Sequence, residues 1–232
     1  MSGKYTNRRD FLAGSMAAAV TVVPRHVLGG AGQNPPSEKL NIAGIGVGGM
    51  GKSNLRQLES EYIVALCDVD REYAAPVFKR YPKAKVYTDY RKMLDKQKDI
   101  DAVLIATPDH THAVISMAAM RRGKHVYCQK PLTHDVYESR MLAKAAKEEG
   151  VVTQMGIQGH SAEGGRLICE WIADGAIGEV TEVDAWCSLS YYPFGHARWS
   201  SRWSRRPKET PPVPSTLDWD IWLGPAPERP YH

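Results

Sequence analysis

The chain has 232 residues, of which 43% are hydrophobic, and a formal net charge of +4. This length fits one or two domains, and the composition is that of a chain with a packed core. Residues 1–32 contain four basic residues and one acid, so the remainder is nearly neutral, and we expect no nucleic-acid partner.

The first thirty residues predict an export signal. Arg8 and Arg9 precede Phe11 and a weakly apolar, alanine-rich stretch that ends at Val23. This order is typical of the bacterial twin-arginine signal, and the stretch is shorter than the roughly 20 residues that span a membrane. We therefore expect residues 1–37 to be signal and linker. We also expect a periplasmic or other extracytoplasmic location, reached by the twin-arginine route, and membrane contact only through an uncleaved signal. A disordered N-terminus with a chance arginine pair is the alternative.

The next segment predicts a nucleotide-binding turn. The apolar run 40–45 leads into two overlapping G-x-G-x-x-G patterns, one starting at Gly44 and one at Gly46. We prefer the second, because the strand then runs through Ile45 before it turns. The first two glycines of this pattern serve the tight turn and the close approach of a pyrophosphate, and the third lets the helix pack closely. The predicted loop comprises Gly46, Val47, Gly48, Gly49, Met50 and Gly51.

A carboxylate follows the second predicted strand. The apolar run 62–67 ends at Asp68, 22 positions after Gly46. A spacing of about 20 is expected for the acid that binds the adenosine ribose hydroxyls. Asp68 favours NAD, because it would repel a 2′-phosphate, while the nearby Arg71 leaves NADP open. The alternative is an unrelated glycine-rich turn followed by a helix-capping aspartate.

Short apolar runs continue to alternate with helical segments as far as residue 155. The predicted strands are 85–87, 101–106, 124–128 and 151–155, and the predicted helices are 70–81 with a late start or kink at Pro76, 88–94 capped by Thr88, 112–122, and 135–149 capped by Asp135 and ended by Gly150. This alternation predicts an α/β fold, a doubly wound parallel Rossmann sheet over residues 38–157. Ligands of such sheets bind at the carboxyl ends of the strands. Cys67 and Cys128 end two of the runs, and we expect buried free thiols there.

Four segments resemble the Gfo/Idh/MocA oxidoreductases. They are 45–51, 65–68, 106–112 and 123–132, and the last reads Gln129-Lys130-Pro131 where the family usually has Glu-Lys-Pro. The resemblance runs from about residue 40 to the end of the chain. It implies an NAD(P)-dependent oxidoreductase that transfers a hydride between the nicotinamide and a carbinol of a sugar or polyol. It also implies that the full-length parent is a homo-oligomer.

The resemblance assigns a catalytic role to Lys130, near the nicotinamide and the reacting carbinol. There its amine would bind the substrate hydroxyl and help to remove its proton, and we expect it to be partly buried. A surface lysine before a turn proline is the alternative. His160 is the second expected catalytic residue, because it could reach the sugar.

The same resemblance implies further contacts to the cofactor. Thr107 and Pro108 would edge it, His112 would lie under its nicotinamide end, and Gln158 would reach the nicotinamide side. The full set implied in this way is Thr107, Pro108, His112, Gln129, Lys130 and Gln158. Asp109, His110 and His112 could form a minimal metal set, but they lie beside a cofactor strand, so we expect no metal site.

The resemblance implies that residues 158–232 are only the start of an α+β substrate and dimerisation domain. A helix at 162–174 capped by Ser161 and a half-exposed strand at 180–189 are expected, with Trp219 and Trp222 anchoring a proline-rich end. The arginine- and tryptophan-rich stretch 196–208 fits a sugar-contacting loop or a subunit contact better than nucleic acid. We expect a C-terminally truncated family member whose own activity is uncertain. The alternatives are an NAD-recycling glycosidase or lyase acting through a transient keto-sugar, and a non-catalytic nucleotide- or sugar-binding fragment.

Overall fold

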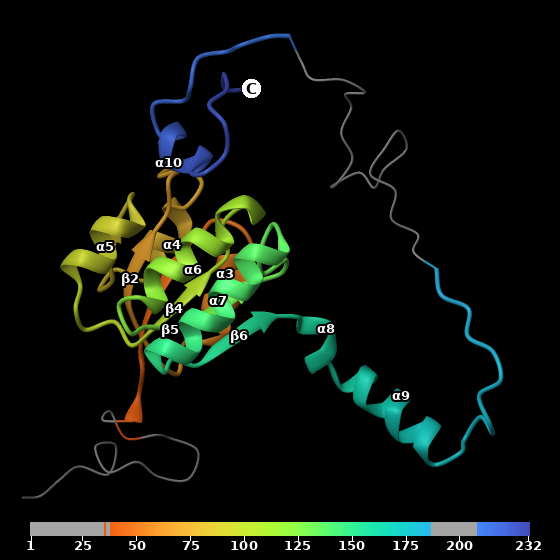
Figure 1. Ribbon diagram of the computed structural model, residues 1–232. Coiled ribbons are helices and arrows are strands. Elements are labelled where there is room, and N and C mark those ends of the chain that lie inside the picture. Colours follow the sequence, from red (N-terminus) through yellow and green to blue (C-terminus); the bar gives the residue numbers. More distant parts are fainter. Residues whose placement is uncertain (1–34, 36–37, 187–207) are drawn as a thin grey trace, which may run out of the picture. The chain divides into compact units, whose positions relative to one another are not determined.

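The computed structural model describes residues 35, 38–186 and 208–232 (Figure 1). All the helices and strands named below belong to the compact unit formed by residues 40–232. The twin-arginine stretch and residues 196–207 lie outside the described residues, so the expectations about them stay predictions.

A six-stranded parallel sheet forms the centre of this unit. Its strand order is β3-β2-β1-β4-β5-β6, and all five neighbouring pairs are parallel. The strands are β1 (Asn41–Ile45), β2 (Tyr62–Cys67), β3 (Lys85–Tyr87), β4 (Ala102–Ile105), β5 (His125–Gln129) and β6 (Thr153–Gly156). The chain starts in the middle, moves to one edge, and returns across β1 to the other. This topology confirms the predicted doubly wound Rossmann fold.

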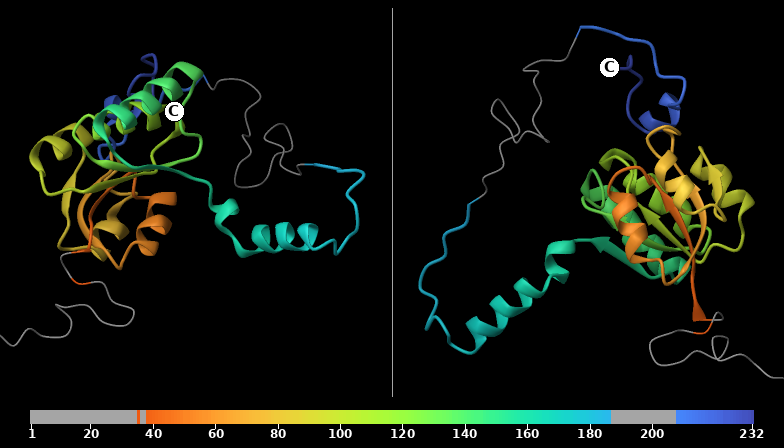
Figure 2. Two further views of the ribbon diagram at one scale, coloured as in Figure 1. Left: turned by 60° about the horizontal axis from the view of Figure 1, so that its bottom comes forward. Right: turned by 180° about the vertical axis from the view of Figure 1, so that it is seen from behind.

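Helices cover both faces of the sheet, as Figure 2 shows. They are α3 (Met50–Gln57), α4 (Ala75–Arg80), α5 (Tyr90–Lys96), α6 (His112–Met120) and α7 (Val136–Glu149), with the 3-10 turn η2 (Asp109–Thr111) before α6. Successive strand residues point to opposite faces: Leu104 packs with Leu55 of α3 on one face, and Ile105 packs with Leu142 of α7 on the other. Because both of their faces are covered, the central strands β1, β2 and β4 are mainly apolar, whereas the edge strands β3 and β6 are largely exposed.

Local side-chain chemistry sets several helix ends. The Asp135 carboxylate accepts a hydrogen bond from the Glu138 N–H at the start of α7, and Gly150 ends that helix in the left-handed region (φ 64°), both as predicted. The predicted cap at Thr88 is wrong, because Asp89 lies directly before α5 and its carboxylate accepts from the Arg91 N–H. The late start expected near Pro76 is found, with Pro76 in the first turn of α4.

Three short helices follow β6 in the described residues. They are α8 (Gln158–Ser161), α9 (Glu163–Ala173) and α10 (Trp219–Leu223). Ser161 ends α8 and Ala162 precedes α9 without a side-chain cap, so the predicted Ser161 cap is wrong. Among the described residues, no helix is both long enough and apolar enough to cross a membrane.

The predicted strand at 180–189 is also wrong over its described part. Residues 180–186 have no regular structure, and Val183 and Trp186 are exposed. Nothing in the described part of the chain offers that segment a neighbouring strand, and an unpaired strand is not stable by itself. Cys67 and Cys128 are buried free thiols, as predicted.

Candidate cofactor and active site

The turn after β1 requires glycine at its first position. Gly46 has a φ of 76°, and a Cβ there would lie 2.6 Å from the Thr107 nitrogen and 2.7 Å from the Ala106 carbonyl. Both obstructing groups are backbone, so they cannot rotate aside as a side chain would. The absence of a side chain lets the turn lie directly against the end of β4.

The other two glycines of the preferred pattern are equally enclosed. A Cβ on Gly48 would overlap the Tyr73 ring, and a Cβ on Gly51 would overlap the Gly46 carbonyl oxygen. Gly51 therefore lets α3 begin in contact with the turn, and no side chain caps that helix start. This geometry supports the pattern that starts at Gly46, and it leaves backbone N–H groups beside a positive helix end.

The Asp68 carboxylate accepts three hydrogen bonds, two of them from this turn and one from its own loop. One carboxylate oxygen accepts from the Val47 and Gly48 N–H groups at 2.8 and 3.1 Å, and the other accepts from the Asp70 N–H at 3.0 Å. Burial raises the pKa of the Asp68 carboxyl above its ordinary value, although the three N–H groups act in the opposite direction. The carboxylate thus links the end of β2 to the glycine turn.

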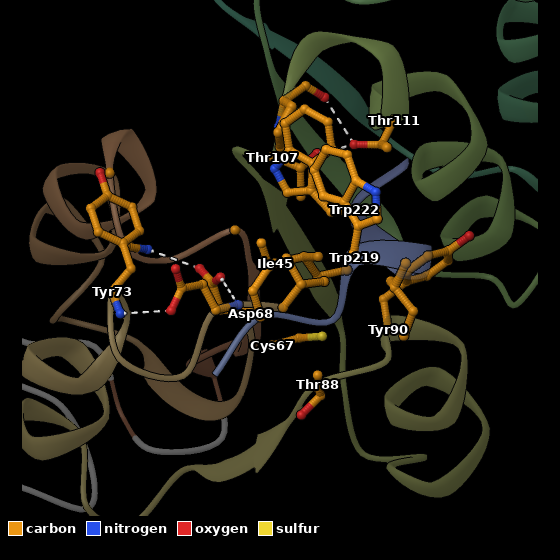
Figure 3. Close-up of a pocket in the computed structure, with 18 of the residues that line it drawn as sticks. Ile45, Cys67, Asp68, Tyr73, Thr88, Tyr90, Thr107, Thr111, Trp219 and Trp222 are labelled. Carbon is orange, nitrogen blue, oxygen red and sulfur yellow. Dashed lines mark hydrogen bonds between the residues drawn. The ribbon is translucent and has the colours of Figure 1, made fainter. Parts of the chain in front are cut away.

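A cavity of about 460 Å³ opens at the carboxyl ends of β1, β2 and β4 (Figure 3). This is the edge at which open parallel sheets bind their ligands. Six of the predicted residues line it: Gly46, Gly48, Gly49, Asp68, Thr107 and Pro108. The cavity therefore joins the glycine turn, the acid after β2 and the residues after β4.

Three other loop and helix positions lie near the turn but do not line the cavity. Val47 and Gly51 are buried under the turn, and Met50 is exposed. Val47 still takes part in the loop through its N–H, which is bonded to Asp68. The predicted role of this stretch is thus carried by backbone more than by side chains.

His112 connects the ends of two strands instead of lining the cavity. Its ring is 1% exposed, with Nε2 2.8 Å from the Thr107 carbonyl oxygen and Nδ1 2.6 Å from the Pro131 carbonyl oxygen. A neutral imidazole has a single N–H, which donates to one of these two oxygens. The ring holds the residue after Lys130 close to the end of β4.

Lys130 is exposed, so the partial burial expected for it is not found. It follows β5 directly, and the Lys130–Pro131 peptide is cis. The neighbouring Gln129 is 5% exposed, and a Cβ on Gly156 would lie 2.8 Å from its Nε2, which has no hydrogen-bond partner in the structure. Gln158 and His160 are exposed on α8, and the structure does not bring them to the cavity.

One family accounts for this arrangement. The oxidoreductase family with an NAD-binding Rossmann fold, Gfo/Idh/MocA, matches residues 40–157, just over half of the chain. The chain belongs to this family. The matched residues begin just before β1 and end just after β6, so they contain the whole sheet.

Individual Gfo/Idh/MocA proteins resemble the chain over the same part. Levoglucosan dehydrogenase of Pseudarthrobacter phenanthrenivorans is 30% identical over 154 residues, which cover 62% of this chain and 39% of that protein. Inositol 2-dehydrogenase of Serratia proteamaculans is 32% identical over 146 residues, covering 60% and 43%. The crystal structure of myo-inositol 2-dehydrogenase from Lactobacillus plantarum superposes with a TM-score of 0.57 and 28% identity, covering 62% and 43%. The chain spans about two-fifths of the length of these relatives.

The cavity of this Gfo/Idh/MocA chain also contains residues that the sequence did not point out as site residues. They are Ile45, Cys67, Val69, Asp70, Tyr73, Thr88, Tyr90, Ala106, Thr111, Ile115, Leu217, Trp219, Ile221, Trp222, Tyr231 and His232. Most of those before residue 120 lie at or after the ends of β1 to β4, where the rule for parallel sheets could have found them. Nothing in the sequence indicated that 217–232 would pack at this edge.

The histidines of 109–112, which were considered as metal ligands, contact backbone carbonyl oxygens instead. His110 Nε2 lies 2.8 Å from the Trp222 carbonyl oxygen, and His112 contacts two carbonyl oxygens. Across the described residues, no three His, Cys, Asp or Glu side chains are grouped so as to hold a metal ion.

Proposed function

We propose that this chain is the cofactor-binding part of an NAD-dependent dehydrogenase that acts on a sugar or polyol. The observation that carries the proposal is the cavity in which the glycine turn, Asp68 and Thr107 meet at the strand ends. Levoglucosan and inositol, named in the relatives, are a sugar derivative and a polyol, which supports this substrate class. Because the chain spans about two-fifths of the length of its relatives, we further propose that it is part of a longer parent protein and that this full-length parent is a homo-oligomer.

The residues of the turn fit a dinucleotide. The glycines leave no Cβ between the backbone and an approaching pyrophosphate, and the uncapped start of α3 presents N–H groups to it. Asp68 stands at the position from which a carboxylate accepts hydrogen bonds from ribose hydroxyls. The buried Nε2 of Gln129, at the end of β5, has no hydrogen-bond partner among the described residues, although Gln129 does not line the cavity.

We infer NAD rather than NADP as the preferred cofactor. The Asp68 carboxylate would repel a 2′-phosphate at the same ribose. The Arg71 guanidinium, which could offset that repulsion, lies against the Thr88 hydroxyl at 3.2 Å. It would have to leave this contact to bind a phosphate.

Lys130 supplies the proton-transfer group in this proposal. Its amine follows β5, and the His112 ring holds the adjoining Pro131 carbonyl near Thr107 at the end of the neighbouring β4. From there it would orient the substrate hydroxyl and take up its proton. A bound nicotinamide would supply the acceptor for the hydride of the carbinol carbon.

We also propose that the protein is exported by the twin-arginine route and works outside the cytoplasm. Arg8 and Arg9, followed by an apolar stretch, support this proposal. That route carries folded proteins, so a cofactor bound before export could travel with the protein. Fusion of residues 1–37 to a reporter tests it, with Arg8→Lys and Arg9→Lys together as the control; export that persists in this variant contradicts the proposal.

The function is tested by looking for bound nucleotide. The purified chain is denatured, the released nucleotides are identified by mass spectrometry, and the unloaded chain is titrated with NAD and NADP. We expect NAD release or NAD binding that is tighter than NADP binding. A chain that neither contains nor binds either dinucleotide refutes the proposal.

The full-length parent then decides the reaction class. Oxidation of a sugar or polyol with accumulation of NADH supports the dehydrogenase. Cleavage without accumulation of NADH, with an absolute need for bound NAD, would identify a cofactor-recycling glycosidase or lyase instead. Binding of NAD without any reaction would leave a non-catalytic binding protein.

A further inference from the structure

The C-terminal segment 208–232 is fixed to the chain directly after Asp68. The Arg71 N–H donates to the Thr216 carbonyl at 3.1 Å, and the Asp218 N–H donates to the Val69 carbonyl at 2.9 Å. Between these bonds Asp70 and Leu217 form an antiparallel bridge. The segment is therefore held by backbone hydrogen bonds at the carboxyl end of β2.

The same segment is fixed a second time at the end of β4. His110 Nε2 lies 2.8 Å from the Trp222 carbonyl oxygen, and Leu223 is buried, with 6% of its surface exposed. A Cβ on Gly224 would lie 3.1 Å from the Thr111 Cγ2, so this turn also packs closely. Helix α10 thus lies between its contacts with the segments that follow β2 and β4.

The part of the segment that lines the cavity is aromatic. The rings of Trp219 and Trp222 stack at a centroid distance of 4.7 Å and an angle of 15°, and Tyr231 meets Trp219 edge-on at 5.2 Å. The Trp219 Nε1–H donates to the Arg229 carbonyl, so its polar atom is already satisfied. All three aromatic residues line the cavity, and Figure 3 shows the two indoles and Tyr73 on opposite sides of Asp68.

We infer that the segment 208–232 forms an aromatic wall of the cofactor site and that Trp219 and Trp222 contact the adenine base. This inference rests on the proposed function. The segment docks one to three residues after Asp68, which marks the adenosine ribose, so its indoles lie at the adenosine end. Flat, apolar rings suit the face of a purine and do not suit a charged pyrophosphate.

The wall lies outside the part of the chain that the family match covers. That match ends at residue 157, and the two indoles come more than 60 residues later. The Rossmann part would therefore supply the turn and the ribose acid, and a remote segment would enclose the base. Such enclosure slows release of the nucleotide, because the wall must open first.

The test compares three alanine variants of the purified chain. Trp219→Ala and Trp222→Ala each remove one indole of the wall. Trp171→Ala is the matched control, because Trp171 is 56% exposed on α9 and does not line the cavity. Dissociation constants for NAD and for ADP-ribose, which lacks the nicotinamide, are measured by calorimetry.

We expect each wall variant to bind both ligands about 5- to 150-fold more weakly, the range for loss of one stacked base. The factor should be the same for NAD and ADP-ribose, because the lost contact is to their shared adenosine. The control should bind within about twofold of the wild type. Trp219→Phe and Trp222→Phe keep a ring in place and should retain most of the affinity.

The possible results distinguish a failure of the aromatic wall from a failure of the proposed function. A wild-type chain that binds neither ligand overturns the proposed function itself. A wild-type chain that binds both, with unchanged or tighter binding in the alanine variants, overturns the wall alone. A loss for NAD without a loss for ADP-ribose would place the indoles at the nicotinamide and also overturn it. A loss in the phenylalanine variants as large as in the alanine variants overturns base stacking.

Discussion

Gly51→Ala tests whether close contact between α3 and the glycine turn decides cofactor binding. Gly51 is the second residue of α3, and a Cβ there would overlap the Gly46 carbonyl oxygen. Gly46 already has a φ of 76° and lies against the backbone of Thr107. The new methyl group can therefore be accommodated only if the start of α3 or the turn itself moves.

The expected cost follows from two opposing effects. Overpacking by one methyl group costs roughly 1–3 kcal/mol, and more where backbone must move. Replacing glycine by alanine inside a helix gains at most about 1 kcal/mol. We expect a net loss of about 2 kcal/mol, which lowers the melting temperature by about 4–8 °C in a chain of this size. Displacement of the turn would also disturb Asp68, which the Val47 and Gly48 N–H groups hold, and should weaken NAD binding at least about tenfold.

Gly164→Ala is the matched control for this measurement. Gly164 is also helical, in α9, but a Cβ there would meet no atom within 4 Å. We expect this variant to melt at or slightly above the wild-type temperature and to bind NAD normally. Thermal unfolding and calorimetric titration of both variants provide the comparison. If Gly51→Ala melts and binds like the wild type, the contact does not have the role described.

Three further outcomes are expected. Asp68→Asn should weaken the binding of NAD more than the binding of NADP in paired titrations. Because burial raises the pKa of the Asp68 carboxyl, the contribution of this group to the free energy of unfolding falls as the pH rises from its ordinary pKa of about 4 to its raised pKa. Unfolding experiments on the Asp68→Asn variant at several pH values should lack that fall. Iodoacetamide at pH 8 should modify the exposed Cys169 and spare Cys67 and Cys128 until the chain unfolds, because both are buried and burial raises the Cys128 pKa to about 11; mass spectrometry of the peptides checks this, and rapid labelling of either buried thiol would contradict it. Lys130→Ala in the full-length parent should reduce the turnover number by about 100-fold or more while NAD affinity stays within about threefold, and unchanged turnover would remove this lysine from the mechanism.

The parts of the fold that depend on neighbouring residues could be predicted. Asp135 and Gly150 end α7 through contacts within one helical turn, and Gly46 reverses the chain through its own backbone angle. The Thr88 cap failed for an equally local reason, since a better acceptor, Asp89, lies one position closer to the helix. The predicted strand was wrong over residues 180–186, because alternation shows which face a strand would bury but not whether a partner strand is present.

The placement of the site residues depended on packing between distant segments. Both ring nitrogens of His112 contact carbonyl oxygens, and no local sequence pattern indicated these partners. Lys130 is exposed, although its motif suggested a partly buried amine. Trp222 was expected to anchor the C-terminal segment, and the contact through which it does so joins it to His110, 112 positions earlier.

The sequence by itself determined the alternation of apolar strands and helices, the glycine turn and the acid at Asp68. These are short-range features, in which backbone angles, side-chain volume and the spacing of a few residues leave little choice of structure. Only the tertiary structure decided that the segment 208–232 packs at the strand ends and that its residues from Leu217 onward contribute to the cavity. Its contacts consist of backbone hydrogen bonds and ring packing across more than 100 positions of the chain, and such contacts leave no periodic or compositional signal in the sequence.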